Sequence, residues 1–221
     1  MRTSRFGWMM LALMACGATA QVRKSQPVGL VLSAGATITR GTATALVKPG
    51  EVLFAGDKLI AGASPVSFLF CPEKYTAAAS AGAELAFQES TAQVKSGALA
   101  NRKSVAACFL PEVQKLSVSS QQHYGVMITR AGSQPPPKTT FDQRVAALNA
   151  DKRNQMQAEL AAAQPADPAF VIVRAAALER AGLWYDAGEA YRQATEQFPE
   201  AAWIRRKTTE IENALLKEQT R

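Results

Sequence analysis

The sequence predicts an all-β region followed by an α-helical region, on three observations. Over residues 21–131, short runs rich in Val, Thr and Ser alternate with Gly and Pro turns about every ten residues, which is typical of a small all-β domain. From residue 141 onward Ala, Glu, Gln, Arg and Leu dominate, as they do in helices. The proline-rich stretch 132–140 predicts a stiff linker between the two. We therefore expect a multidomain β-then-α chain, with domains over 21–131 and 141–221.

The first twenty residues have the pattern of an export signal. Two arginines precede an apolar run over residues 6–15, and Ala18-Thr19-Ala20 then supplies the small residues of a cleavage site. About ten apolar residues are too few to cross a bilayer, which takes about 20. We therefore expect residues 1–20 to be a signal peptide and the mature protein to be periplasmic or secreted, without a transmembrane span.

A second processing route competes with this cut. Leu13-Met14-Ala15-Cys16 resembles the lipobox of bacterial lipoproteins, in which the cysteine is lipidated and becomes the new N-terminus. In that alternative, Cys16 carries a lipid that anchors the protein to a membrane. One molecule cannot be processed both after Ala20 and before Cys16, so the sequence leaves the soluble and the lipid-anchored forms open.

Two cysteines, Cys71 and Cys108, remain after the signal peptide, and both lie in apolar, strand-like surroundings. An exported chain meets an oxidising compartment, so we expect them to form a disulfide, with two free buried thiols as the alternative. A catalytic thiol would need a base, and the single histidine, His123, lies in a predicted turn that nothing places beside either cysteine. One histidine and three cysteines predict no metal site and no cofactor.

The β region is expected to form short strands over 28–32, 36–40, 58–60, 66–70, 84–87, 113–118 and 125–130. Two turns in it pair a glycine with an acidic residue, at Gly50-Glu51 and Gly56-Asp57. Glycine gives these turns backbone freedom, and the acidic side chain can accept hydrogen bonds from amides of its own turn. With these turns and strands, residues 28–88 resemble a FecR-like domain. The resemblance implies an extracytoplasmic β module that relays or receives protein contacts.

The helical region contains one repeat-like pattern over residues 168–201. Gly182 separates two apolar stretches, Trp184 and Tyr191 stand where large side chains are buried, and Pro199 ends the second stretch. This segment resembles a tetratricopeptide repeat. A single repeat cannot bury its own apolar face, so we expect helices over 141–162 and 200–218 to cover it. By position in such repeats, the first helix would line a protein-binding groove with Ile172, Ala176, Glu179 and Arg180.

Charge and motifs exclude several classes of function. The net charge is +7, but the basic excess is spread through the β region. The densest basic run, Arg205-Arg206-Lys207, lies among glutamates and predicts a solvated helix face, so we expect no nucleic-acid binding. The sequence holds no glycine-rich phosphate loop, no histidine metal cluster and no nucleophile elbow, and we therefore expect no enzyme activity.

These observations favour an exported, non-catalytic adaptor or scaffold of the bacterial cell envelope. Its expected partners are other envelope proteins or peptides, which it would bind through the helical domain. One alternative is a regulatory or sensory module that receives a signal from a membrane receptor through the FecR-like domain. Another is attachment to the cell wall or to a polysaccharide.

Overall fold

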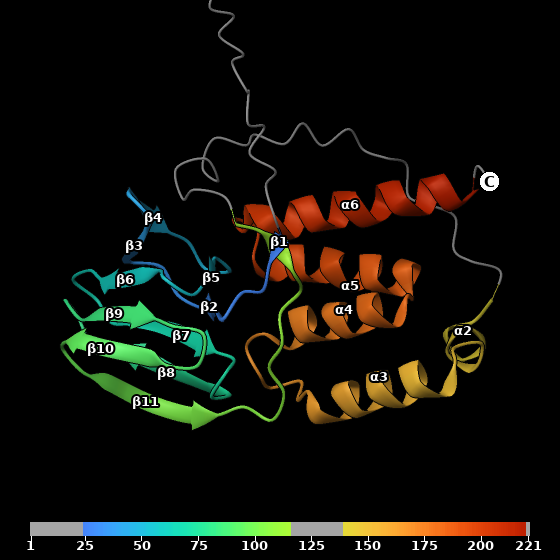
Figure 1. Cartoon of the computed structure of the whole chain (residues 1–221), viewed down its shortest axis with the longest axis horizontal. Coiled ribbons are helices and arrows are strands. Elements are labelled where there is room, and N and C mark those ends of the chain that lie inside the picture. The colour runs from blue at the N-terminus through green and yellow to red at the C-terminus, as the bar shows by residue number, and fades with distance from the viewer. Residues whose placement is uncertain (1–23, 116–138, 220–221) are drawn as a thin grey trace, which may run out of the picture.

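The computed structural model describes residues 24–115 and 139–219 (Figure 1). Within these ranges a β region precedes a helical region, which confirms the predicted order. The predicted signal peptide, the lipidation residue Cys16, His123, the predicted strand over 125–130 and most of the predicted linker lie outside the described residues.

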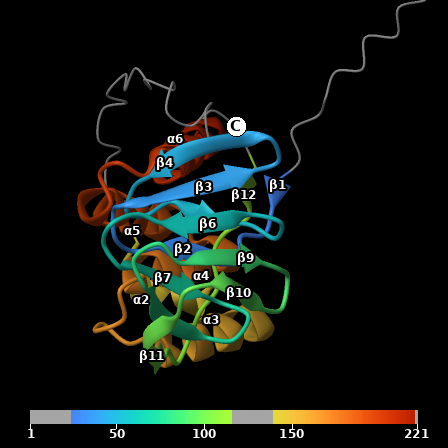
Figure 2. The same cartoon turned by 90° about the vertical axis from the view of Figure 1, so that its left-hand side faces the viewer.

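The β region contains two five-stranded antiparallel sheets that pack face to face. We call the one with the order β10-β9-β6-β3-β4 the outer sheet, seen face-on in Figure 2, and the one with the order β11-β8-β7-β2-β5 the inner sheet. Their strands are β2 (Gly29–Val31), β3 (Ala36–Arg40), β4 (Ala43–Val47), β5 (Val52–Leu53), β6 (Lys58–Ala61), β7 (Val66–Phe70), β8 (Tyr75–Ala79), β9 (Glu84–Phe87), β10 (Ala92–Ser96) and β11 (Leu99–Ser104). A separate ribbon pairs β1 (Lys24–Ser25) with β12 (Val113–Gln114).

Apolar side chains fill the space between the two sheets. Ile38 and Leu59 of the outer sheet and Phe68 of the inner sheet are fully buried there. The rings of Phe68 and Phe87 meet edge to face across the sheets, with centroids 5.5 Å apart. Alternate side chains of a strand point to opposite faces, so this core uses every second residue.

The second glycine–acid turn is held by a buried ion pair. The Asp57 carboxylate accepts a hydrogen bond from the Phe54 backbone N–H at 2.9 Å, which confirms the expected contact with its own turn. It also binds Arg40 Nη2 at 2.8 Å, and both side chains are almost fully buried. The turn is thereby fixed to the end of β3.

The helices are α2 (Phe141–Ala146), α3 (Ala150–Ala162), α4 (Phe170–Ala181), α5 (Trp184–Gln197) and α6 (Ala202–Gln219). Helices α3 to α6 stack side by side in Figure 1. Gly182, in a left-handed conformation with φ of 87°, ends α4 where the sequence predicted a break. The single helix expected over 141–162 is wrong: Asn149 has an extended conformation and its side chain caps α3 by accepting the Lys152 N–H.

The two regions share one hydrophobic core. Leu30, Val52 and Leu69 project from the second face of the inner sheet and join Ile172 and Trp203 of the helices in a single cluster. The inner sheet is therefore covered on both faces, by the outer sheet and by the helices, which gives the three layers of Figure 1. Burial on both faces explains why the predicted strand over 66–70 is almost continuously apolar.

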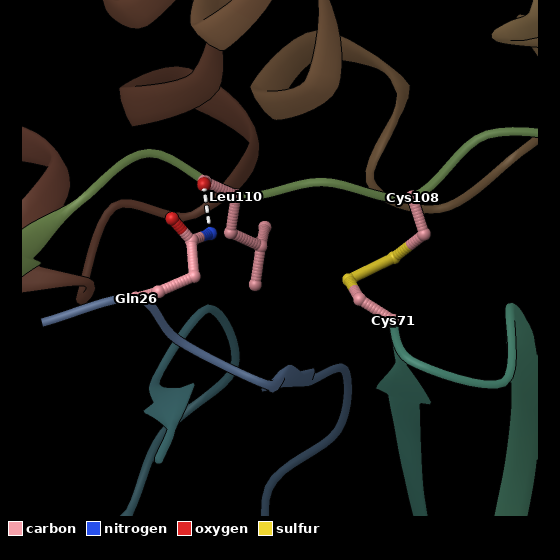
Figure 3. Close-up of a disulfide and its surroundings, with 4 residues drawn as sticks. All are labelled: Gln26, Cys71, Cys108 and Leu110. Carbon is pink, nitrogen blue, oxygen red and sulfur yellow. Dashed lines mark hydrogen bonds between the residues drawn. A yellow bond between two sulfur atoms is a disulfide. The ribbon is translucent and has the colours of Figure 1, made fainter. Parts of the chain in front are cut away.

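Residues 105–112, which we call the bridging segment, pass between the inner sheet and the helices (Figure 3). Val105 and Leu110 are buried in the shared core. A disulfide ties Cys108 to Cys71 at the end of β7, and the Gln26 side-chain amide donates a hydrogen bond to the Leu110 carbonyl (Figure 3). Both tethers fasten the segment to the β region.

A close contact joins the β4–β5 turn to the α5–α6 junction. Trp203 Nε1 donates a hydrogen bond to the Gly50 carbonyl at 2.5 Å. A Cβ atom on Gly50 would lie 2.7 Å from Phe198 Cβ and 2.8 Å from Ala201 Cβ. Lys48 and Glu200 form an ion pair at the edge of this contact, at 2.9 Å. The predicted Gly50-Glu51 turn thus forms part of the interface with the helices.

Candidate binding site

A groove of about 410 Å³ opens where the two regions meet. One wall is the β1–β12 ribbon, and the other is one face of α6. We call it the junction groove, and its lining residues are Lys24, Val113, Gln114, Trp203, Arg206, Lys207, Thr209, Glu210 and Asn213. Its volume lies in the range of about 300 to 1,000 Å³ that ligand sites occupy in proteins.

Lys207 is the most unusual lining residue, because its charged side chain is only 5% exposed. Its Nζ lies 2.5 Å from Glu179 Oε1 of α4, and Glu179 also accepts a hydrogen bond from the Tyr191 hydroxyl at 2.7 Å. These contacts join α4, α5 and α6. A buried ammonium is tolerated when a carboxylate compensates its charge, as Glu179 does here.

The environment of Tyr191 changes the acidity of its hydroxyl. Burial of the side chain, and next the neighbouring Glu179 carboxylate, raise the pKa of Tyr191 well above its ordinary value of 10.0. The hydroxyl therefore stays protonated and keeps donating to Glu179. The Tyr191 hydroxyl thus remains a hydrogen-bond donor to Glu179 in the neutral pH range.

Trp203 forms the apolar part of the groove. It is 2% exposed and is held in place by its hydrogen bond to Gly50, so one edge of the site depends on the β4–β5 turn. Val113 of β12 also lines the site and is 6% exposed. The groove thus combines an apolar floor with charged walls, the combination that binding sites use for affinity and orientation.

The charges that line the groove are mainly positive. Lys24, Arg206 and Lys207 carry three positive charges, and Glu210 carries one negative charge. Lys24 and Glu210 form an ion pair across the rim, where both side chains are about half exposed. Exposed pairs contribute little to stability, so this pair can open at low cost.

The four residues predicted to form a groove on α4 do not form one. Ile172 and Ala176 are buried in the core, with 0% and 2% exposure, and Glu179 is bound to Lys207. Arg180 pairs with Glu159 at 2.8 Å, and its guanidinium lies 3.9 Å from the centroid of the Phe109 ring. The cavity beside Arg180 measures only about 10 Å³, because α3 covers this face of α4.

The predicted solvated face at Arg205-Arg206-Lys207 also needs correction. Arg206 and Lys207 line the junction groove, and Lys207 is buried. The sequence contains a pattern that indicates the burial of Lys207. Lys207 lies four residues after Trp203 and four before Ile211, so it belongs to the apolar stripe of its helix.

Cys71 and Cys108 are joined by a disulfide, with Cα atoms 4.9 Å apart. In the part of the chain that the structure describes, no three His, Cys, Asp or Glu side chains gather as metal ligands. None of the helices in residues 24–115 and 139–219 combines the length and the hydropathy of a membrane span.

The FecR-like and tetratricopeptide resemblances are interpretations of the sequence. They rest on the short glycine–acid turns of the β region and on the aromatic and glycine positions of α4 and α5. Comparisons of this chain with protein-family models, with curated proteins and with solved structures found no match.

Proposed function

We propose that the protein is an exported, non-catalytic interaction protein of the bacterial cell envelope, and that it holds a partner protein in the junction groove. The observation that carries the proposal is the composition of this groove. The β region supplies one wall and α6 supplies the other, so the site exists only when both regions are docked. A FecR-like β module and a tetratricopeptide-like helical hairpin both act by presenting surfaces to other proteins.

Export is supported by the disulfide and by the predicted signal peptide. Disulfides form and persist in oxidising compartments such as the bacterial periplasm, and this one lies between the inner sheet and the helices. A mature protein that begins at Gln21 would be periplasmic or secreted. One that begins at a lipidated Cys16 would present the same groove from a membrane surface.

Site-directed photo-crosslinking in intact cells tests the binding part of this proposal. A photoreactive amino acid replaces Asn213, which is exposed at the groove, and a control variant carries it at Ile60 on the outer sheet, 39% exposed. We expect one envelope protein to be crosslinked from Asn213 and not from Ile60, and the same crosslink to form when both proteins are purified. Equal crosslinking from both positions, or none, would contradict the proposal.

The intact mass of the mature protein tests the export part. A mass that begins at Gln21 and is two hydrogen atoms lighter than the dithiol supports a soluble, disulfide-bonded protein. A lipidated Cys16 supports the anchored form. Retention of residues 1–20 on a protein recovered from the cytoplasm would contradict export. If the crosslinked partner is a transmembrane regulator, the regulatory alternative is favoured over the adaptor.

A further inference from the structure

We propose that the ligand of the junction groove is an acidic peptide segment of the partner, with carboxylates that bind Lys207, Arg206 and Lys24. This inference rests on the proposed function and specifies its binding chemistry. It is carried by the buried cation in the groove and by the sign of the surrounding charge.

The first argument concerns Lys207. An ammonium group has three N–H donors. Among the described residues, its ion-pair contact is with Glu179 Oε1, which occupies one of these donors. A lysine with 5% exposure that also lines a 410 Å³ groove can donate its remaining hydrogen bonds to a ligand there. A hydrogen bond from such a charged donor to a carboxylate is roughly twice as strong as one between neutral groups.

The second argument is charge complementarity. The lining carries three cations and one carboxylate, and Glu179 behind it already compensates Lys207. A ligand that carries carboxylates therefore matches the sign of the charge along this lining.

The third argument selects a peptide as the anion. The groove lies between a β ribbon and a helix, and the proposed function places a segment of a partner protein there. A peptide can carry several carboxylates on one chain, one for each of the lining cations Lys24, Arg206 and Lys207.

Fluorescence anisotropy with two labelled peptides tests the inference on the mature, disulfide-bonded chain. One peptide is Glu-Leu-Glu-Leu-Glu-Glu, and in the other every Glu is replaced by Gln. We expect the acidic peptide to bind at least about tenfold more tightly, which corresponds to one ion pair of about 1.4 kcal/mol. Its affinity should fall as salt is added, because salt screens exposed charges.

Three variants separate site-specific binding from general attraction to a basic protein. Arg206→Gln removes a cation that lines the groove, and Arg102→Gln removes an exposed cation of β11 outside it. We expect about a tenfold loss of affinity for R206Q and no change for R102Q. Lys207→Met is made together with Glu179→Gln, so that no buried charge is left unpaired, and it should also lose binding.

The outcomes distinguish this inference from the proposed function. Equal binding of both peptides, or equal loss in R206Q and R102Q, would overturn the acidic-peptide inference. So would tight binding of phosphatidylglycerol vesicles through Arg206 in the absence of peptide binding, which would assign the groove to a membrane surface. A partner that is crosslinked from Asn213 through a segment without acidic residues would leave the proposed function standing and overturn the inference alone.

Discussion

Asp57 is the buried residue on which the turn between β5 and β6 depends. Its carboxylate holds Arg40 and the Phe54 N–H, and Arg40 also donates to the Val52 carbonyl at 2.9 Å. Loss of one partner of a buried ion pair usually costs about 3 to 5 kcal/mol, because the other charge stays buried. Glu51 lies 4.0 Å from Arg40 and partly compensates the charge of Arg40, which reduces this cost.

We therefore expect Asp57→Asn to lower the free energy of unfolding by about 3 kcal/mol, measured by denaturant unfolding. The matched control is Glu73→Gln, which breaks the exposed pair of Arg102 and Glu73 and should cost less than about 1 kcal/mol. Equal effects of the two substitutions would contradict a stabilising role for the buried pair.

Tyr191 gives a prediction for alkaline pH. Burial, followed by the Glu179 carboxylate, raises the pKa of Tyr191 in the folded protein, whereas the unfolded chain loses this proton near pH 10.0. Above that pH the unfolded state binds fewer protons than the folded state, so stability falls as the pH rises toward the folded pKa.

Tyr191→Phe removes this titration and the hydrogen bond to Glu179. We expect the variant to be about 1 to 3 kcal/mol less stable at neutral pH and to lose less stability than the unmodified protein above pH 10. Urea unfolding at a series of pH values measures both effects. Parallel curves above pH 10 would show that Tyr191 does not titrate as its surroundings indicate.

At the scale of elements, the β4–β5 turn packs closely against the helical region. Gly50 has φ of +85° and its missing Cβ leaves room for Phe198 and Ala201. Gly50→Ala should cost about 2 to 4 kcal/mol, part of it from the left-handed backbone and part from the overpacked interface. Thermal or denaturant unfolding measures the loss.

Gly56→Ala separates these two contributions. Gly56 has a similar φ of +91°, and nothing lies within 4 Å of the position of its Cβ. It should therefore show only the backbone cost of about 1 to 2 kcal/mol. If Gly50→Ala were no worse than Gly56→Ala, the turn would not be tightly packed against the helices.

The sequence predicted elements best where a local pattern decides them. The strands over 36–40, 66–70 and 84–87 agree with β3, β7 and β9, and Gly182 marks the break between α4 and α5. Strand β8 holds three alanines, which have little preference for strands, and it forms because β7 and β11 pair with it on both sides. Such pairing partners lie outside any local sequence window.

The site was harder to predict than the fold. The predicted groove assumed that one face of α4 is open, but α3 and the shared core cover it. The junction groove combines Lys24 with Lys207, and their proximity follows from the docking of the two regions. The spacing of Trp203, Lys207 and Ile211 indicated that Lys207 lies on the buried face of its helix. It gave no information on which part of the β region faces that helix.

At the scale of the whole molecule, the disulfide secures the segment that lies between the layers. Cys71 and Cys108 are separated by 37 residues, and closure of such a loop stabilises the folded state by about 4 kcal/mol through the unfolded chain. Cys71→Ser combined with Cys108→Ser should lower the free energy of unfolding by about this amount. Reduction of the unmodified protein is the control and should have the same effect.

Hydrogen exchange of the same double variant reports whether both regions respond. The bridging segment contacts the inner sheet and the helices, so peptides from β7 and α4 should lose protection together. Loss of protection in the helices alone, with β7 still protected, would show that the regions unfold independently.

The shared core also has a consequence for the newly made chain. The hydrogen-bonded residues Gly50 and Trp203 are 153 positions apart. At about 5 to 20 residues per second, the ribosome needs on the order of ten seconds to pass from one to the other. Until the helices have followed, Leu30, Val52 and Leu69 of the inner sheet lack the apolar side chains, such as Ile172 and Trp203, that cover them in the folded protein. This half of the core can therefore be completed only after α6 has been synthesised.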